Sequence, residues 1–216
     1  MKICHLTSVH IPYDTRIFVK ECRSAARHGH EVHLVARHDA DEVLDGVYLH
    51  AVEKSGNRIK RMTATVARVY RKALEIDADI YHFHDPELVP AGLLLKFRGK
   101  CVIYDIHEDY SSWLTFNEGI PAWLRNPAAR AFTGLEGLAA RHFDALVAVT
   151  PSICQRFSAV NSRTVLVRNF PLPDELAPDG PGKIPWESRG NAVCYIGGIF
   201  PKRGLKEMVR AVSIAG

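Results

Sequence analysis

Residues 81–87 read YHFHDPE, and this stretch holds four side chains of types that bind metals. They are His82, His84, Asp85 and Glu87, and imidazole and carboxylate groups suit zinc or iron. On a strand, the two histidines would point to the same face, as a ligand pair requires. The Asp-Pro-Glu sequence that follows is also typical of a helix start, with Asp85 as the N-cap.

Three interpretations of this stretch therefore compete: a metal site, one wall of a hydrogen-bonding crevice, and plain packing and capping. A metal would need a third ligand from the HEDY sequence at 107–110, after the next predicted strand. We favour the crevice wall and expect no metal. In that arrangement His84 faces the pocket, Asp85 and Glu87 lie at a helix terminus, and His82 packs within the sheet.

Polar clusters follow four of the predicted strands, namely SVHIPYDTR (8–16), HDPE (84–87), HEDY (107–110) and TPS (150–152). Loops at the carboxyl ends of parallel strands converge on one crevice, so the four clusters together favour a shared site, although capping explains each one alone. The first cluster contains no glycine, which argues against an NAD-binding fingerprint. Asp14 and Arg16 stand at the entrance of the next helix, where Asp14 either caps the helix or meets a sugar hydroxyl.

Short apolar runs alternate with segments of helical period, and this alternation predicts an α/β fold with a parallel sheet and helices on both faces. The predicted strands are 2–6, 31–36, 47–52, 79–83, 101–106, 145–149 and 164–167. The predicted helices are 16–29, 59–74, 86–97 and 126–143, the last with Pro127 in its first turn. We expect a loop at 113–124.

Five prolines near residues 171–185 predict a linker. The predicted organisation is one domain at 1–170, a proline-rich linker at 171–190, and the start of a second, incomplete domain at 191–216, with an apolar strand and then a helix.

The composition excludes several function classes. A net charge of +4 over 216 residues, without basic runs, argues against nucleic-acid binding. Five scattered cysteines are typical of a reducing compartment. The start of the sequence lacks the apolar stretch of a signal peptide, and no run is long enough to span a membrane, so we expect a cytoplasmic protein.

One predicted helix has a basic face, formed by Arg58, Lys60, Arg61, Arg68, Arg71 and Lys72. This face either rests on the anionic inner surface of the cytoplasmic membrane or is simply solvated.

Several ordered motifs resemble the N-terminal half of a family-4-type glycosyltransferase (GT4) with the two-domain, Rossmann-like GT-B architecture. The motifs are YDTRIFVKECRSAARHGHEVHLVA, YHFHDPEL, VIYDIHEDY, VAVTPSICQRF, VLVRNFP and CYIGGIFPKRGLKEMV. In VLVRNFP, Arg168 and Phe170 replace the usual proline and glycine around Asn169. Gly198 stands where many members carry an arginine.

The resemblance implies roles for particular residues. His107 matches the family histidine near the reacting sugar and would be catalytic. The acceptor-side crevice would include Asp14, Arg16, His84, Asp85, Glu108 and Asn169. The donor diphosphate would meet Gly197, Gly198, Lys202 and Arg203.

The implied reaction is sugar transfer from a nucleotide-sugar to a glycan or lipid-linked acceptor in bacterial surface polysaccharide synthesis (O-antigen, capsule), with retention of configuration and no obligatory metal or other cofactor. Because most of the donor domain has no counterpart here, we expect the 216-residue chain alone to be inactive. The alternatives are a nucleotide-sugar epimerase of the same architecture, a non-catalytic truncated binding module, and a metal hydrolase using His82 and His84.

Overall fold

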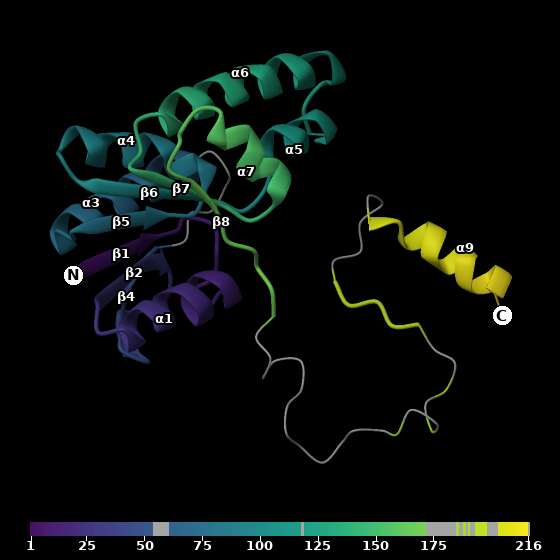
Figure 1. Ribbon diagram of the computed structural model, residues 1–216, viewed down its shortest axis with the longest axis horizontal. Coiled ribbons are helices and arrows are strands. Elements are labelled where there is room, and N and C mark those ends of the chain that lie inside the picture. The colour runs from purple at the N-terminus through teal and green to yellow at the C-terminus, as the bar shows by residue number, and fades with distance from the viewer. Residues whose placement is uncertain are drawn as a thin grey trace. The chain divides into compact units, whose positions relative to one another are not determined.

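The computed structural model describes residues 1–53, 61–117, 119–171, 185, 188, 190, 193–197 and 203–215 (Figure 1). The chain divides into two compact units, Met1–Phe170 and Pro171–Gly216. The first unit contains the whole sheet. No helix in the described part of the chain is long and apolar enough to cross a bilayer.

One eight-stranded sheet forms the centre of the first unit, with the strand order β3-β4-β2-β1-β5-β6-β7-β8. The strands are β1 (Lys2–Leu6), β2 (Glu31–Arg37), β3 (Glu42–Leu44), β4 (Val47–Val52), β5 (Ile80–Phe83), β6 (Cys101–Ile106), β7 (Ala145–Ala148) and β8 (Thr164–Leu166). All neighbouring pairs are parallel except β3 with β4. The seven predicted strands are confirmed to within one residue at each end.

Strand β3 was missed by the sequence analysis because it has only three residues. It pairs with β4 through a two-residue turn, Asp45-Gly46, in which both residues have positive φ (52° and 79°). Asp-Gly is a typical sequence for such a hairpin turn, and it was the available signal.

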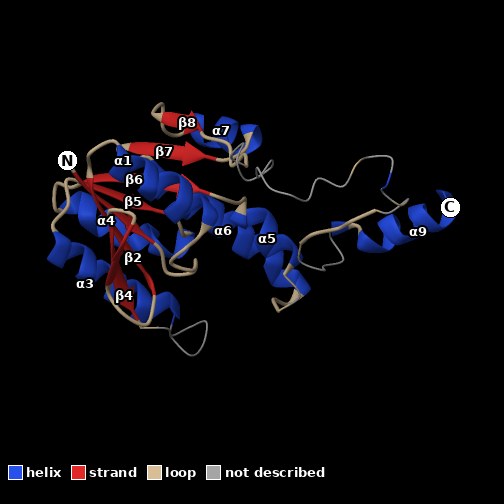
Figure 2. Cartoon of the chain, turned by 90° about the horizontal axis from the view of Figure 1, so that it is seen from below, coloured by secondary structure: helices blue, strands red, loops and turns tan. Residues whose placement is uncertain are grey.

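The helical segments cover both faces of the sheet (Figures 1 and 2). They are η1 (Thr15–Cys22), α1 (Arg23–Arg27), η2 (Arg61–Thr65), α3 (Val66–Ile76), η3 (Pro86–Leu88), α4 (Val89–Phe97), α5 (Tyr110–Phe116), α6 (Ala122–Ala140), α7 (Pro151–Ser158) and, in the second unit, α9 (Leu205–Ala215). The predicted fold class is therefore confirmed: a Rossmann-like parallel sheet with helices on both faces.

Two expectations about the helices were wrong. Part of the predicted loop at 113–124 is helix α5, which Asp109 caps by accepting a hydrogen bond from the Ser112 amide (3.5 Å). Helix α6 begins at Ala122, after Pro121, so Pro127 lies inside it rather than in its first turn. Pro121 already supplies the helix-start signal, and Pro127 removes only one later backbone hydrogen bond.

The second unit differs from expectation in one respect. Its predicted helix is present as α9, but residues 193–196 form no strand. A strand requires a partner for its backbone hydrogen bonds, and the described residues of 171–216 provide none. Most of the predicted linker lies outside the described residues.

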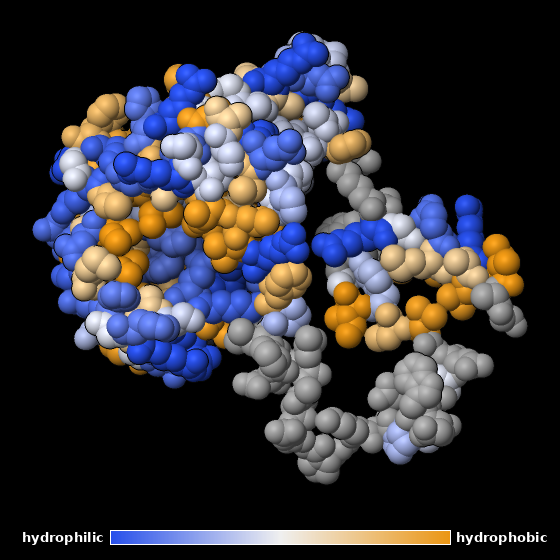
Figure 3. All heavy atoms as spheres, viewed as in Figure 1, coloured by the Kyte–Doolittle hydropathy of each residue, from blue (hydrophilic) through white to orange (hydrophobic). Residues whose placement is uncertain are grey.

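Alternate side chains of the strands lie on opposite faces of the sheet and contribute to two apolar cores. On β2, Val32, Leu34 and Ala36 pack with η1, whereas Val35 belongs to the larger core under α3, α4, α6 and α7. On the face that Figure 3 shows, the first unit carries polar residues with apolar areas between them.

The central strands follow the same alternation, with a different consequence. Their fully buried apolar residues face the larger core, and their other face carries His5, His82 and Asp105, with His84 just beyond β5. The face that η1 covers is thus apolar under β2 and β4 and polar in its centre.

Candidate functional site

A cavity of about 480 Å³ lies at the carboxyl ends of the central strands. The chain runs outward from β1 to β2 and β4 and then returns to β5 on the other side of β1, so the strand order reverses between β1 and β5. Ligands of open α/β sheets bind at such reversal points.

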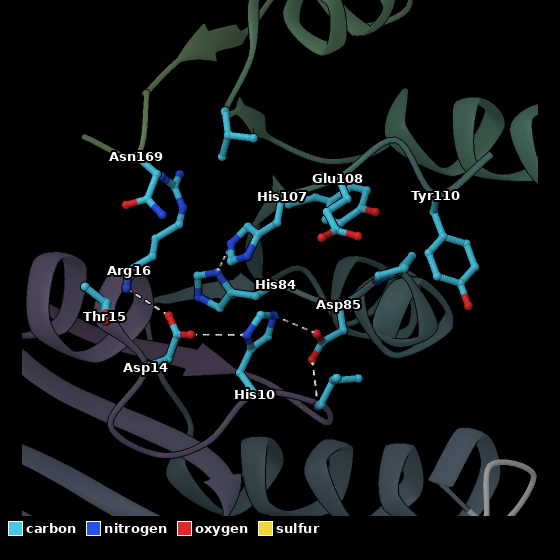
Figure 4. Close-up of a pocket in the computed structure, with 14 residues that line it drawn as sticks. His10, Asp14, Thr15, Arg16, His84, Asp85, His107, Glu108, Tyr110 and Asn169 are labelled. Atoms are coloured by element: carbon cyan, nitrogen blue, oxygen red, sulfur yellow. Dashed lines mark hydrogen bonds and ion pairs between the residues drawn. The ribbon is translucent and has the colours of Figure 1, made fainter. Parts of the chain in front are cut away.

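The cavity brings together seven of the residues that the sequence analysis singled out (Figure 4). They are Asp14, Arg16, His84, Asp85, His107, Glu108 and Asn169. Of the four polar clusters, TPS contributes no lining residue, because Thr150 caps α7 by accepting from the Ile153 amide (3.3 Å). Gly197 and Arg203 lie in the second unit, and Gly198 and Lys202 lie outside the described residues.

The loop after β1 is held by Asp85. Its Oδ2 accepts hydrogen bonds from Thr7 Oγ1 (2.7 Å), from the Ser8 amide (2.6 Å) and from the Val9 amide (3.2 Å). Asp85 occupies the N-cap position of η3, as predicted, but its side chain makes no capping bond to that helix. Glu87 likewise accepts from Ser8 Oγ (2.9 Å). Both acids therefore connect the segment after β5 to the loop after β1, because their hydrogen-bond partners follow β1 and do not belong to η3.

The entrance of η1 is capped by Asp14. Its Oδ1 accepts from the amides of Arg16 (2.8 Å) and Ile17 (3.0 Å), which decides in favour of the capping alternative for that oxygen. The segment is a π-helix, whose backbone hydrogen bonds join residues five apart and bring them onto one face. Arg16 and Glu21 are five apart, and Arg16 Nε lies 3.1 Å from Glu21 Oε1.

Arg16 is buried, at 5% exposed, and forms a two-pronged ion pair with Asp105. Nε and Nη2 donate to the two carboxylate oxygens at 2.9 and 3.0 Å, and Nη1 donates to the Val167 carbonyl at 3.2 Å. Arg16 therefore lines the cavity, but its Nε, Nη1 and Nη2 atoms donate to protein groups. The sequence analysis missed Asp105, although an acid inside the apolar strand CVIYDI was a visible signal.

Asp105 also anchors two histidines. Its Oδ2 lies 2.9 Å from His107 Nε2 and 3.3 Å from His84 Nδ1. Burial raises the pKa of Asp105, but the hydrogen bonds from His107 and His84 outweigh it and hold that pKa well below its usual range. Burial lowers the pKa of His84. Because an ionised carboxylate only accepts, the network assigns the proton of His107 to Nε2 and leaves Nδ1 as an acceptor.

His10 was quoted within its cluster but not singled out. It lies between two carboxylates, with Nδ1 3.4 Å from Asp14 Oδ2 and Nε2 3.4 Å from Asp85 Oδ1 (Figure 4). Burial lowers the pKa of His10, but the hydrogen bond to Asp14 and the charges of Asp85, Asp14 and Glu108 outweigh it, so that pKa is raised. The hydrogen bond with His10 holds the pKa of Asp14 well below its usual range.

Exposed polar groups complete the mouth of the cavity. Glu108 and Asn169 are exposed, and Asn169 Oδ1 accepts from Lys20 Nζ (2.9 Å). Tyr110 also lines the cavity, and its ring stacks on Trp113 with a centroid separation of 5.0 Å. This mouth offers hydrogen-bond donors and acceptors beside an aromatic surface.

Two groups of described residues bring metal-ligand atoms within 4.8 Å of one another: His84, Asp105 and His107, and His5, Glu21, His82 and His84. The first group is paired internally, as described above. The second shares only His84 with the cavity. Burial and the Asp105 charge raise the pKa of Glu21 to about 9, and burial lowers the pKa of His82 to about 3.

Comparison with solved structures shows the fold. Sucrose-phosphate synthase from Thermosynechococcus elongatus aligns with a TM-score of 0.57 and 13% identity, over 80% of this chain and 51% of that one. The catalytic domain of starch synthase IV from Arabidopsis thaliana, bound to ADP and acarbose, gives 0.54 and 12%, over 78% and 51%. Apo UGT2 from Phytolacca americana gives 0.52 and 8%, over 81% and 53%.

The chain thus spans about half the length of the solved structures that it matches. A search of curated proteins found no match. The sequence model of Glycosyltransferase Family 4, in contrast, matches residues 16–170, which is most of the chain and nearly all of the first unit. The chain belongs to Glycosyltransferase Family 4.

Proposed function

We propose that this protein takes part in the transfer of a sugar from a nucleotide-sugar to a hydroxyl of a glycan or lipid-linked acceptor, and that its first unit binds the acceptor. The observation that carries the proposal is the cavity at the reversal of strand order, which gathers seven separately identified residues in a member of this family.

The chemistry of the cavity mouth suits a sugar. Hydroxyl groups both donate and accept hydrogen bonds, and His10, Glu108, Tyr110 and Asn169 supply donors and acceptors at this mouth. The volume of about 480 Å³ falls in the range of small-molecule sites.

His107 is the residue that we place at the reacting sugar. Asp105 fixes its ring through Nε2, and Nδ1 accepts a hydrogen bond from a substrate hydroxyl. A group held in this way orients the substrate without reorganising during the reaction, which lowers the barrier. His107 lines the cavity and has 15% of its side chain exposed, so a substrate can reach it.

The donor diphosphate is expected at Gly197, Gly198, Lys202 and Arg203. Gly197 has φ +151°, a conformation that favours glycine, and Arg203 lies just before α9, whose N-terminal amides favour anions. Cationic groups and backbone amides would neutralise the leaving diphosphate, so the proposed mechanism requires no catalytic metal. We also propose that the transfer retains the anomeric configuration, as the family resemblance implies.

The proposed setting is bacterial surface polysaccharide synthesis at the cytoplasmic face of the membrane. Two exposed aromatic residues of α5 and α6, Phe116 (62% exposed) and Trp123 (78%), support a peripheral membrane contact. The basic face of η2 and α3 supports it less, because Arg68 and Lys72 pair with Glu53 and Glu75.

The test is a transfer assay on the full product of the gene. Radiolabelled nucleotide-sugars are incubated with and without a lipid-linked sugar acceptor, and the anomeric configuration of the product is determined by NMR. We expect acceptor-dependent transfer with retention, which His107→Ala lowers about 100-fold. The exposed His28→Gln, on α1's C-terminal side, is the matched control and should be unchanged. Conversion of the nucleotide-sugar without acceptor would instead support the epimerase alternative.

A further inference from the structure

Three histidines and one glutamate meet on the face of the sheet that η1 covers. His5 of β1 and His82 of β5 are register partners, and His84 lies two residues beyond His82, so it points to the same side. The ring centroids are 4.7 to 5.3 Å apart. Glu21, from the last turn of η1, is brought over these rings.

This cluster contains two unsatisfied polar atoms. Glu21 Oε2 and His82 Nε2 are both buried and have no hydrogen-bond partner in the described part of the chain. Such atoms are rare in folded proteins because burial without a partner is unfavourable. Two of them in one cluster of metal-binding side chains point to a missing cation.

The distances fit a small metal ion. Glu21 Oε2 lies 3.8 Å from His5 Nδ1 and 3.8 Å from His84 Nε2, and these two nitrogens are 3.0 Å apart. In the plane of these three atoms, the point equidistant from them lies about 2.1 Å from each. This distance is the length of Zn–N and Zn–O bonds. We propose that His5, Glu21 and His84, with His82 as the fourth ligand, bind one Zn²⁺ ion.

Asp105 and Arg16 orient two of the proposed ligands, His84 and Glu21. His84 Nδ1 lies 3.3 Å from Asp105 Oδ2, which directs the His84 Nε2 lone pair into the cluster, and Arg16 holds the other oxygen of Glu21. Carboxylates that orient ligating histidines in this way are typical of metal sites. Metal binding displaces the proton shared by His5 and His84.

Four protein ligands, of which His5 and His84 are buried and Glu21 and His82 partly buried, fill the coordination shell, so the zinc would be structural. It would brace β1, β5 and η1 beneath the cavity without contacting substrate. This inference is independent of the proposed sugar transfer.

A second histidine pair provides an internal control. His33 Nδ1 lies 2.8 Å from His50 Nε2, and His33 Nε2 lies 2.9 Å from Glu31 Oε1. This pair resembles the cluster in composition, but none of its atoms is buried without a partner among the described residues.

The test is calorimetric titration of the chelator-treated 216-residue chain with Zn²⁺, together with the visible absorption of the Co²⁺ form, which reports tetrahedral coordination. We expect one Zn²⁺ per chain. His82→Gln and Glu21→Gln should each reduce the Zn²⁺ affinity by more than about 100-fold, which exceeds the loss caused by removing a residue that only hydrogen-bonds a metal ligand. His50→Gln should bind as the wild type does.

Circular dichroism of each metal-free variant shows whether it folds. If one of the two cluster variants does not fold, the Zn²⁺ affinity of the other tests the proposal. Zn²⁺ should raise the thermal midpoint of the wild type and His50→Gln, but not of the two cluster variants. Absence of stoichiometric binding by the wild type, or binding that His50→Gln abolishes and the cluster variants retain, would overturn the proposal.

Discussion

The cavity has two parts with opposite properties. Its floor consists of the lining residues Arg16, His84 and Asp85, together with Asp105, the partner of Arg16 and His84. All four are at most 5% exposed and bonded to other protein groups. Its rim consists of His10, His107, Glu108 and Asn169, which are more exposed.

The difference between floor and rim lies in where their hydrogen bonds go. The floor groups are satisfied by other protein groups, so removing one leaves a buried charge or donor without that partner, and the loss appears in folding stability. The rim groups keep capacity for a ligand, so their loss should appear in binding. The following predictions test this division.

The largest effect is expected at the floor, for Asp105→Asn. Without the carboxylate, the buried guanidinium of Arg16 loses its two-pronged ion pair and keeps only Glu21 and the Val167 carbonyl as partners, which should lower the free energy of unfolding by about 3 to 5 kcal/mol. Urea denaturation followed by circular dichroism measures this change. As a control, Lys72→Met breaks the surface pair with Glu75 and should cost less than about 1 kcal/mol. Equal losses for the two variants would contradict the division.

Asp85→Ala should have the next largest effect on the free energy of unfolding, about 2 to 3 kcal/mol, because Ser8 and Val9 lose their common acceptor. Thr7→Val removes one donor to the same carboxylate and the acceptor of the His10 amide (3.0 Å), and it should cost about 1.5 kcal/mol. The same denaturation experiment gives both values. If Thr7→Val costs as much as Asp85→Ala, the carboxylate does not organise this loop.

At the rim, His107→Ala should separate binding from stability. We expect the free energy of unfolding to change by less than about 1 kcal/mol, and affinity for a bound glycoside to fall about tenfold, or 1.4 kcal/mol. The affinity is measured by NMR titration, with His28→Gln as the control. A loss of stability as large as that of Asp105→Asn would place His107 in the floor.

The smallest effect concerns His10 and pH. Its pKa is raised in the folded protein, so its ion pairs stabilise fully below the unfolded value of about 6.5, and this contribution is lost as pH rises through the folded value. Relative to His10→Gln, the wild type should be more stable at pH 6 than at pH 8.5 by about 0.5 kcal/mol. An advantage that instead grows with pH would show that His10 is neutral between its two carboxylates.

The strands and the cavity position could be predicted from sequence because both depend on local patterns. Apolar runs give the strands, and polar residues after parallel strands must share one edge of the sheet. Five of the floor and rim residues were found by this argument: Arg16, His84, Asp85, His107 and Glu108.

The partners within the floor could not be predicted in this way. Arg16 and Asp105 are 89 residues apart, and only the folded sheet places them together. Glu21 was missed because helical periodicity assumes 3.6 residues per turn, whereas the π-helix aligns residues five apart. Asp85 was assigned to the wrong partner because its local sequence is typical of an N-cap, and its tertiary bonds prevailed.

The central claim is that a sugar acceptor binds at the rim of this cavity, and NMR titration tests it most directly. The ¹⁵N-labelled chain is titrated with a panel of methyl glycosides, and backbone amide shifts are followed. The account predicts saturable shifts at His10, His107, Glu108 and Asn169 with at least one glycoside. Saturable shifts confined to another surface, such as the apolar groove lined by Leu93, Phe97 and Leu135, would contradict it.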